Sequence, residues 1–195
     1  MLGVLLLIVA TPFAAVIALL IRIDSPGPVI FRATRVGKDS RRFTMYKFRT
    51  MSADAEARLP ALAHLNLGGQ RLIRIPDDPR VTHIGRLLRR TDMDELPQLV
   101  NVLKGDMSLV GPRPQAPNEV ALYTALERRR LSVRPGLTGL WQVTARANPS
   151  FDEWTRWDLQ YISNWSIGLD LAIIARTVWM VVGGMFGKHS LEMTP

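Results

Sequence analysis

Two adjacent acids, Asp94 and Glu95, are the residues best placed to do chemistry in this 195-residue chain. Arginines precede them in sequence at positions 86, 89 and 90, and Arg113 follows between two prolines. A carboxylate can approach a phosphate when nearby cations neutralise the charge of that phosphate. The pattern therefore indicates an anionic nucleophile that meets a phosphorylated substrate. The plain alternative is that the acids only cap a helix, which is a common role for acids at a helix start.

A short helix should position the acid pair. Pro97 fits only the first turn of a helix, and Gly105 is a typical helix stop. Between them, apolar residues recur at helical spacing and predict one buried face: Leu96, Leu99, Val100 and Leu103. We therefore expect Asp94 to be the N-cap and Glu95 the first helical residue. There the helix dipole stabilises both a carboxylate and a bound phosphate.

The composition points to an anionic partner. The chain carries 25 Lys and Arg against 17 Asp and Glu, a formal net charge of +8. Nucleic acid, anionic lipid and a phosphorylated substrate would all suit this excess, but no nucleic-acid-binding motif is recognised, so no nucleic acid is expected. The chain has no cysteine, which excludes disulfides and thiolate metal sites, and its three histidines show no ligand spacing.

The N-terminal 21 residues carry no charge, and this length of apolar sequence indicates a membrane segment. A cleaved signal peptide is disfavoured, because no basic region precedes the apolar run and no small-x-small site closes it. Thr11-Pro12 lies near the middle, where proline frees a backbone carbonyl and kinks or breaks a helix. The segment can therefore span the bilayer, or enter it and turn back with both ends on one side.

Beyond the membrane segment, the pattern predicts a mostly helical α+β fold. A β-hairpin or an extended platform is expected over Val29–Met51, and its basic residues favour contact with anionic headgroups over a merely solvated surface: Arg32, Arg35, Lys38, Arg41, Arg42, Lys47 and Arg49. A capped aromatic helix should run from Ser150 to Trp165. A final apolar helix is expected over 165–187. Because it contains Asp170 and Arg176, it is typical of an amphipathic interfacial helix rather than a span.

Six motifs along the chain together resemble the bacterial sugar transferase family. They are IDSPGPVIF, RVGK, FTMYKFRTM, DPRVTHIGRLLRRT, DELPQLVNVLKGDMSLVGPRP and RPGLTGLWQV. Members of this family are monotopic polyprenyl-phosphate phosphoglycosyl transferases, which start exopolysaccharide, capsule and O-antigen assembly. The motifs occur in the family's order and cover nearly the whole chain, which makes the resemblance specific.

The resemblance implies a reaction. A UDP-sugar gives its sugar-1-phosphate to undecaprenyl phosphate, and UMP leaves. Asp94 matches the nucleophile of the family's Asp-Glu dyad, which forms a covalent phosphosugar intermediate. Glu95 matches the partner associated with Mg2+ and proton handling, so Asp94 and Glu95 are the expected metal-linked carboxylates. Arg89 and Arg113 match positions associated with phosphate binding. The sugar stays open among galactose, glucose and N-acetylated sugars.

The resemblance also implies how the chain is placed relative to the membrane. Residues 1–23 would form a re-entrant membrane helix broken at Thr11 and Pro12. Residues 24–195 would form a membrane-associated catalytic domain on the cytoplasmic face of the bacterial inner membrane, with anionic lipids as partners and a homodimer as one possible state. Asp92-Met93 departs from the small polar residue and leucine that are usual before the dyad. Many members carry a basic, aromatic stretch before the helix, so a longer N-terminus is compatible with the pattern.

A non-catalytic basic module that binds the membrane surface is the alternative from a different class. The acid pair distinguishes the two hypotheses, because a purely basic binder gains nothing from carboxylates inside its cationic groove.

Overall fold

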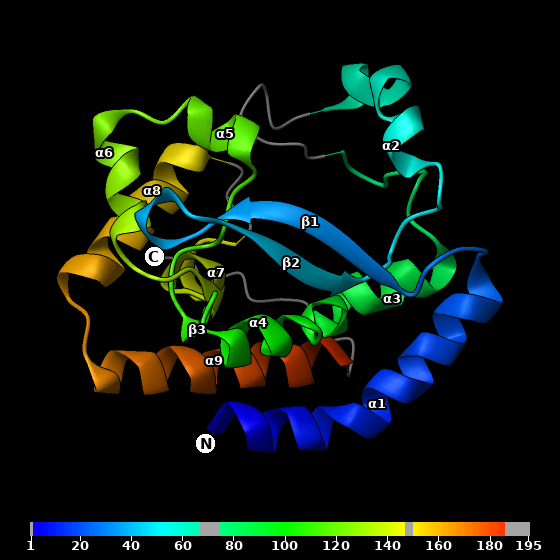
Figure 1. Ribbon diagram of the computed structural model, residues 1–195, viewed down its shortest axis with the longest axis horizontal. Coiled ribbons are helices and arrows are strands. Elements are labelled where there is room, and N and C mark those ends of the chain that lie inside the picture. The colour runs from blue at the N-terminus through cyan, green and yellow to red at the C-terminus, as the bar shows by residue number, and fades with distance from the viewer. Residues whose placement is uncertain (1, 67–74, 147–149, 186–195) are drawn as a thin grey trace.

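The computed structural model describes residues 2–66, 75–146 and 150–185, and it is mostly helical with two small sheets (Figure 1). The expected hairpin is confirmed: strands β1 (Ile30–Val36) and β2 (Arg42–Phe48) pair antiparallel, with Ile30 opposite Phe48. Strands β3 (Ser108–Val110) and β4 (Gly136–Thr138) form a short parallel pair. The predicted α+β class is therefore correct for the described residues.

Helices surround the hairpin. The α-helices are α1 (Leu2–Asp24), α2 (Ala55–Arg58), α3 (His83–Arg90), α4 (Gln98–Lys104), α5 (Pro117–Ala121), α6 (Ala125–Arg128), α7 (Leu140–Thr144), α8 (Phe151–Ser163) and α9 (Ile167–Met185). Short 3-10 turns connect them: η1 (Lys38–Ser40), η2 (Pro60–Leu65), η3 (Met93–Glu95) and η4 (Arg129–Ser132). The capped aromatic helix expected from Ser150 is α8, and the Ser150 hydroxyl accepts from the Glu153 N–H.

Helix α1 continues through Thr11 and Pro12 without interruption. Its axis bends near the middle in Figure 1, so the proline bends the helix instead of ending it. The second half of α1 joins the core, where Ile17 and Ile21 pack with Phe48 of β2 and Leu88 of α3. Within the described residues, no helix combines the length and the apolar character needed to cross a bilayer.

Helix α9 runs across the lower part of the molecule in Figure 1, above the N-terminal half of α1. Its inner face contributes Ile173, which packs in a cluster with Val110, Val143 and Tyr161. Large apolar residues on and just before this helix are exposed: Trp165, Ile167, Leu171, Val178, Trp179 and Val182. The helix lies within the range predicted for an interfacial helix, 165–187, and its outer apolar face has the composition of such a helix.

Candidate active site

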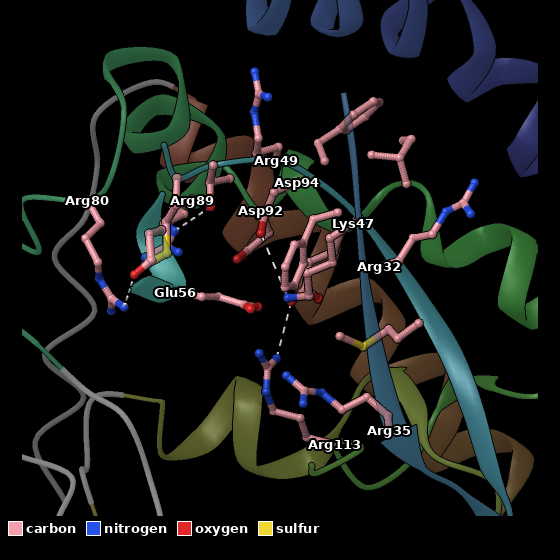
Figure 2. A pocket seen from close by; sticks show the side chains of 18 of the residues that line it. Arg32, Arg35, Lys47, Arg49, Glu56, Arg80, Arg89, Asp92, Asp94 and Arg113 are labelled. Carbon is pink, nitrogen blue, oxygen red and sulfur yellow. Dashed lines mark hydrogen bonds and ion pairs between the residues drawn. The ribbon is translucent and has the colours of Figure 1, made fainter. Parts of the chain in front are cut away.

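A pocket of about 1080 Å³ opens beside the hairpin, with η3 and α7 at its wall. Eight cationic side chains line it, together with four carboxylates: Arg32, Arg35, Lys47, Arg49, Arg80, Arg89, Arg113 and Arg146, with Glu56, Asp92, Asp94 and Glu95. Figure 2 labels all of these side chains except Arg146 and Glu95. Cations outnumber acids two to one, so the pocket is suited to an anionic ligand. All four expected site residues, Arg89, Asp94, Glu95 and Arg113, lie in this one pocket.

The acid pair sits in a 3-10 turn, so the expected helix start at Asp94 is wrong. Asp94 and Glu95 belong to η3, and α4 begins only at Gln98 with Pro97 in the N-cap position. Asp92 adopts a left-handed backbone (φ 54°), which separates the end of α3 from η3 and places the acids before α4. The dipole of α4 therefore does not stabilise the two acids as expected, and their negative charge must be stabilised by side chains.

Helix α4 ends at Gly105 as expected, with a left-handed φ of 79° that glycine adopts without strain. Its buried face differs from the prediction, because Leu103 is 42% exposed whereas Asn101 is fully buried. The Asn101 side chain donates to the Thr44 carbonyl (2.7 Å) and accepts from the Tyr46 N–H (3.1 Å). This polar link fixes α4, and the acid turn before it, against strand β2.

Strand β2 supplies the cation that holds the acid pair. Lys47 Nζ donates to Glu95 Oε1 at 2.6 Å and stands 3.9 Å from Asp94 Oδ2, beyond hydrogen-bond distance. Arg113 Nη1 donates to the same Glu95 oxygen at 3.3 Å. Glu95 is therefore anchored by two cations, whereas the Asp94 carboxylate faces the pocket beside them.

These contacts separate the two acids chemically. Burial raises the pKa of the Asp94 carboxyl to about 6, and the positive charge of Lys47 only partly opposes this. Burial also acts to raise the pKa of Glu95, but Lys47 and Arg113 outweigh it and lower that pKa to about 2. At neutral pH both acids are ionised, and Asp94 is the more basic of the two.

The two predicted phosphate-binding arginines reach the pocket from different elements. Arg89 extends from the end of α3, and its Nε donates to Thr50 Oγ1 at 2.9 Å. Burial lowers the pKa of this guanidinium. Arg113 lies between two prolines, and its backbone carbonyl accepts from Arg130 Nη2 at 3.5 Å. The Arg89 guanidinium is thus held by a hydrogen bond to Thr50 at the pocket wall, and the Arg113 backbone is held from outside the pocket, which lowers the entropic cost of holding an anion.

Sequence reasoning missed the role of the hairpin in this site. The sequence pattern favours contact with anionic headgroups for all the basic hairpin residues, yet Arg32, Arg35, Lys47 and Arg49 line the pocket. Arg49 also donates to the backbone carbonyls of Ser25 and Pro26, where the chain leaves α1. Strand alternation puts Lys47 on the same face as the buried Met45. This alternation can be predicted from the sequence. Which face of the hairpin packs against the turn containing Asp94 and Glu95 depends on contacts between distant segments, and the sequence pattern does not reveal it.

Asp92, the departure from the usual family pattern, has a partner. Arg146, just after α7, donates through both terminal nitrogens to the two oxygens of the Asp92 carboxylate, each at 2.5 Å. This fork holds the left-handed residue that precedes the acid turn, which gives a physical reason for an acid at this position.

The donor set fits a magnesium ion held largely by substrate. Among the described residues no group of three or more His, Asp or Glu side chains is placed to hold a metal. Mg2+ commonly binds one or two carboxylates together with substrate phosphates and water. Asp94 suits this role better than Glu95, whose Oε1 already accepts from two cations. Figure 2 shows Glu56 directed into the same pocket.

The chain is similar to known proteins over most of its length. The family model for "Bacterial sugar transferase" matches residues 1–184. The chain is 48% identical to a galactosyl transferase, CpsE, of Streptococcus agalactiae serotype III, over 83% of this chain and 36% of that protein. It is 38% identical to an undecaprenyl-phosphate galactose phosphotransferase of Salmonella typhimurium, over 92% of this chain and 38% of that protein.

A third relative is the UDP-glucose:undecaprenyl-phosphate glucose-1-phosphate transferase of Escherichia coli K12, which is 38% identical over 91% of this chain and 38% of that protein. The chain thus spans less than two fifths of the length of these three relatives. The family match nevertheless covers almost the whole of this chain, from the N-terminal helix through α8 and most of α9. The chain therefore belongs to the bacterial sugar transferase family.

Proposed function

We propose that this chain transfers sugar-1-phosphate from a UDP-sugar to undecaprenyl phosphate, the first membrane step of exopolysaccharide, capsule or O-antigen synthesis. The observation that carries the proposal is the buried Asp94 carboxylate, which faces a cationic pocket with Lys47 beyond hydrogen-bond distance. The names of the relatives support the donor and acceptor classes, since they specify galactose or glucose phosphotransfer and undecaprenyl phosphate.

The proposed reaction has two displacements at one phosphorus. An Asp94 oxygen attacks the phosphorus that bears the sugar, and the bond from this phosphorus to the bridging oxygen breaks. The electron pair stays on that oxygen, which leaves as part of UMP. An oxygen of undecaprenyl phosphate then attacks the same phosphorus and displaces Asp94. A covalent aspartyl phosphosugar between the two steps splits one difficult transfer into two easier ones.

The surrounding side chains keep Asp94 reactive. Lys47 holds Glu95 in place and, at 3.9 Å, favours the ionised form of Asp94 without occupying its lone pairs through a short hydrogen bond. Arg89 and Arg113 are placed to neutralise the diphosphate as the carboxylate approaches. When bound, Mg2+ would neutralise further charge on the diphosphate oxygens, with Asp94 as its main protein carboxylate.

Release of UMP from UDP-sugars tests this function. We expect the chain, with Mg2+ and undecaprenyl phosphate, to release UMP from one of UDP-galactose, UDP-glucose or their N-acetylated forms. Without acceptor, one equivalent of UMP should appear, and intact-mass analysis should find one sugar phosphate on the peptide containing Asp94. Asp94→Asn keeps the shape but is a far weaker nucleophile, so turnover should fall by about 10³-fold or more.

Asp152→Asn, at an exposed residue in the first turn of α8, is the matched control and should retain activity. A chain that releases UMP in the Asp94→Asn form and shows no covalent adduct would instead use direct attack by the lipid phosphate. No release from any UDP-sugar would favour the non-catalytic membrane-binding module.

We also propose that α1 is re-entrant and that α9 lies in the interface on the cytoplasmic face of the inner membrane. Exposed apolar side chains support this placement on α1 at Phe13, Val16 and Leu19, and on α9 at Leu171 and Trp179. The chain has no cysteine, so a single Leu2→Cys substitution provides a unique label. We expect labelling from the cytoplasmic side in intact cells; periplasmic labelling would show that α1 passes through the bilayer.

A further inference from the structure

Arg35 on strand β1 is a pocket cation that the proposed mechanism leaves without a role. Figure 2 shows its side chain beside that of Arg113, with both directed into the same part of the pocket. Its one side-chain hydrogen bond among the described residues runs from Nη1 to the backbone carbonyl of Thr34, at 3.4 Å. Within that part of the chain, no carboxylate lies within ion-pair distance of Arg35.

The electrostatics of Arg35 show that its charge is poorly compensated. Burial lowers the pKa of the Arg35 guanidinium, the charge of Glu119 raises it, and the charge of Arg113 lowers it again. Glu119 is committed elsewhere, because its carboxylate accepts from the Ala116 N–H at 2.7 Å and caps α5. Two neighbouring guanidinium groups repel each other in a partly desolvated site, and an anion bound between them would remove that repulsion.

We propose that Arg35 and Arg113 together hold the nucleotide-side phosphate of the donor, the phosphate that leaves with UMP. This inference rests on the proposed function, and it assigns the leaving group to a place in the pocket. Arginine suits the role, because its planar fork binds two phosphate oxygens at once.

The positions of the side chains decide between the two phosphates of the donor. The phosphate that Asp94 attacks must lie against Asp94, and Arg113 contacts the neighbouring Glu95. In Figure 2 the Arg35 side chain lies beside that of Arg113, at the part of the pocket away from Asp94. A diphosphate places its second phosphorus one bridging oxygen away from the first, which brings it toward Arg113 and Arg35. When the bridging bond breaks, the new negative charge therefore forms beside both guanidinium groups.

Binding and kinetics of Arg35 variants test the assignment. Arg35→Gln removes the charge, Arg35→Lys keeps it without the fork, and Arg42→Gln is the matched control, because Arg42 is an exposed residue of the same hairpin that does not line the pocket. Calorimetry should show UMP binding weakened by about 10-fold to 100-fold in Arg35→Gln, the usual loss for a charged hydrogen-bonded contact. Arg35→Lys should fall between Arg35→Gln and the natural chain, and Arg42→Gln should match the natural chain.

Kinetic measurements show whether Arg35 contacts the donor or the acceptor. In Arg35→Gln, acceptor-independent UMP release should slow by a similar factor, while the KM for undecaprenyl phosphate stays unchanged. Unchanged UMP affinity overturns the proposal, and unchanged UMP affinity with a raised KM for undecaprenyl phosphate would assign Arg35 to the lipid phosphate instead. Calorimetry with UMP needs no turnover, so it tests Arg35 even if the natural chain releases no UMP, the result that would overturn the proposed function itself.

Discussion

Among the described residues, two of the buried aspartates, Asp94 and Asp158, are buried for different purposes. Asp158 on α8 is 1% exposed, and its Oδ2 accepts from Arg130 Nε at 2.8 Å and lies 2.7 Å from Arg130 Nη2. Asp94 is 8% exposed, and Lys47 Nζ stands 3.9 Å from its carboxylate. One carboxylate is thus neutralised by direct contact in the core, and the other keeps its charge available at a pocket wall.

The difference shows which kind of buried charge marks a reactive site. A buried carboxylate without a close partner costs folding free energy, so pairing is the arrangement that favours stability. Arg130 completes such an arrangement, because it also donates to the Tyr123 hydroxyl at 2.7 Å and lies over the Phe151 ring. Burial raises the pKa of both carboxyl groups to about 6, so the pKa does not distinguish them. Their contacts do, because Asp94 has no cation within hydrogen-bond distance among the described residues, which is expected where a carboxylate must react.

The two regions are connected through one backbone group. Arg130 Nη2 donates to the carbonyl of Arg113, whose side chain reaches the acid pair. The ion pair between Arg130 and Asp158 in the core therefore supports the loop that presents Arg113 to the pocket.

Breaking the core pair should have the largest effect on stability. Asp158→Asn leaves the buried Arg130 guanidinium without a counter-charge, so we expect the free energy of unfolding to fall by about 3–5 kcal/mol. Urea unfolding of the chain in detergent micelles measures this loss. The Arg130→Met, Asp158→Leu double variant removes both charges and should recover part of it. Equal stability of Asp158→Asn and the natural chain would show that the pair contributes nothing.

Local sequence signals were sufficient for the elements around the site. The hairpin was predictable because apolar alternation and turn residues act over a few positions, and Gly105 and Ser150 marked helix ends by their own chemistry. The grouping of Asp94 with Arg113 was predictable because a recognised motif contains both.

The rest of the site depends on contacts between distant segments. Lys47 lies 48 positions before Glu95, and Arg146 lies 54 positions after Asp92, so no local pattern reveals either contact. The 3-10 turn at Asp94 follows from the left-handed Asp92, which its pairing with Arg146 supports. Leu103 matched a helical face by spacing, but the buried Asn101 takes that face because it bonds the β2 backbone.

A smaller effect on stability than that of Asp158→Asn is expected at Asp94, where removing the charge should stabilise the protein. Its pKa is raised from the ordinary value of 3.8 to about 6 by burial, so the folded state prefers the protonated acid. This preference adds stability below the unfolded pKa and is lost as the pH rises through the folded pKa. Above pH 6 the ionised carboxylate thus costs roughly 3 kcal/mol relative to the neutral acid.

Asp94→Asn places a neutral group of the same shape at this position. At pH 7.5 we expect its unfolding free energy to exceed that of the natural chain by about 1–3 kcal/mol, a rise in Tm of roughly 2–10 °C. The difference should shrink as the pH falls from 6 and vanish near pH 4, where the natural Asp94 is protonated as well. Thermal unfolding across this pH range measures it.

Glu95→Gln sharpens the test, because the neighbouring acid should respond with the opposite sign. Lys47 and Arg113 outweigh burial and lower the pKa of Glu95 to about 2, so its ionised form stabilises the fold at neutral pH and is lost only in strong acid. Glu95→Gln should therefore lower Tm at pH 7.5 while Asp94→Asn raises it. If both substitutions lower Tm, Asp94 is a structural anchor like Asp158, and its burial no longer argues for a reactive role.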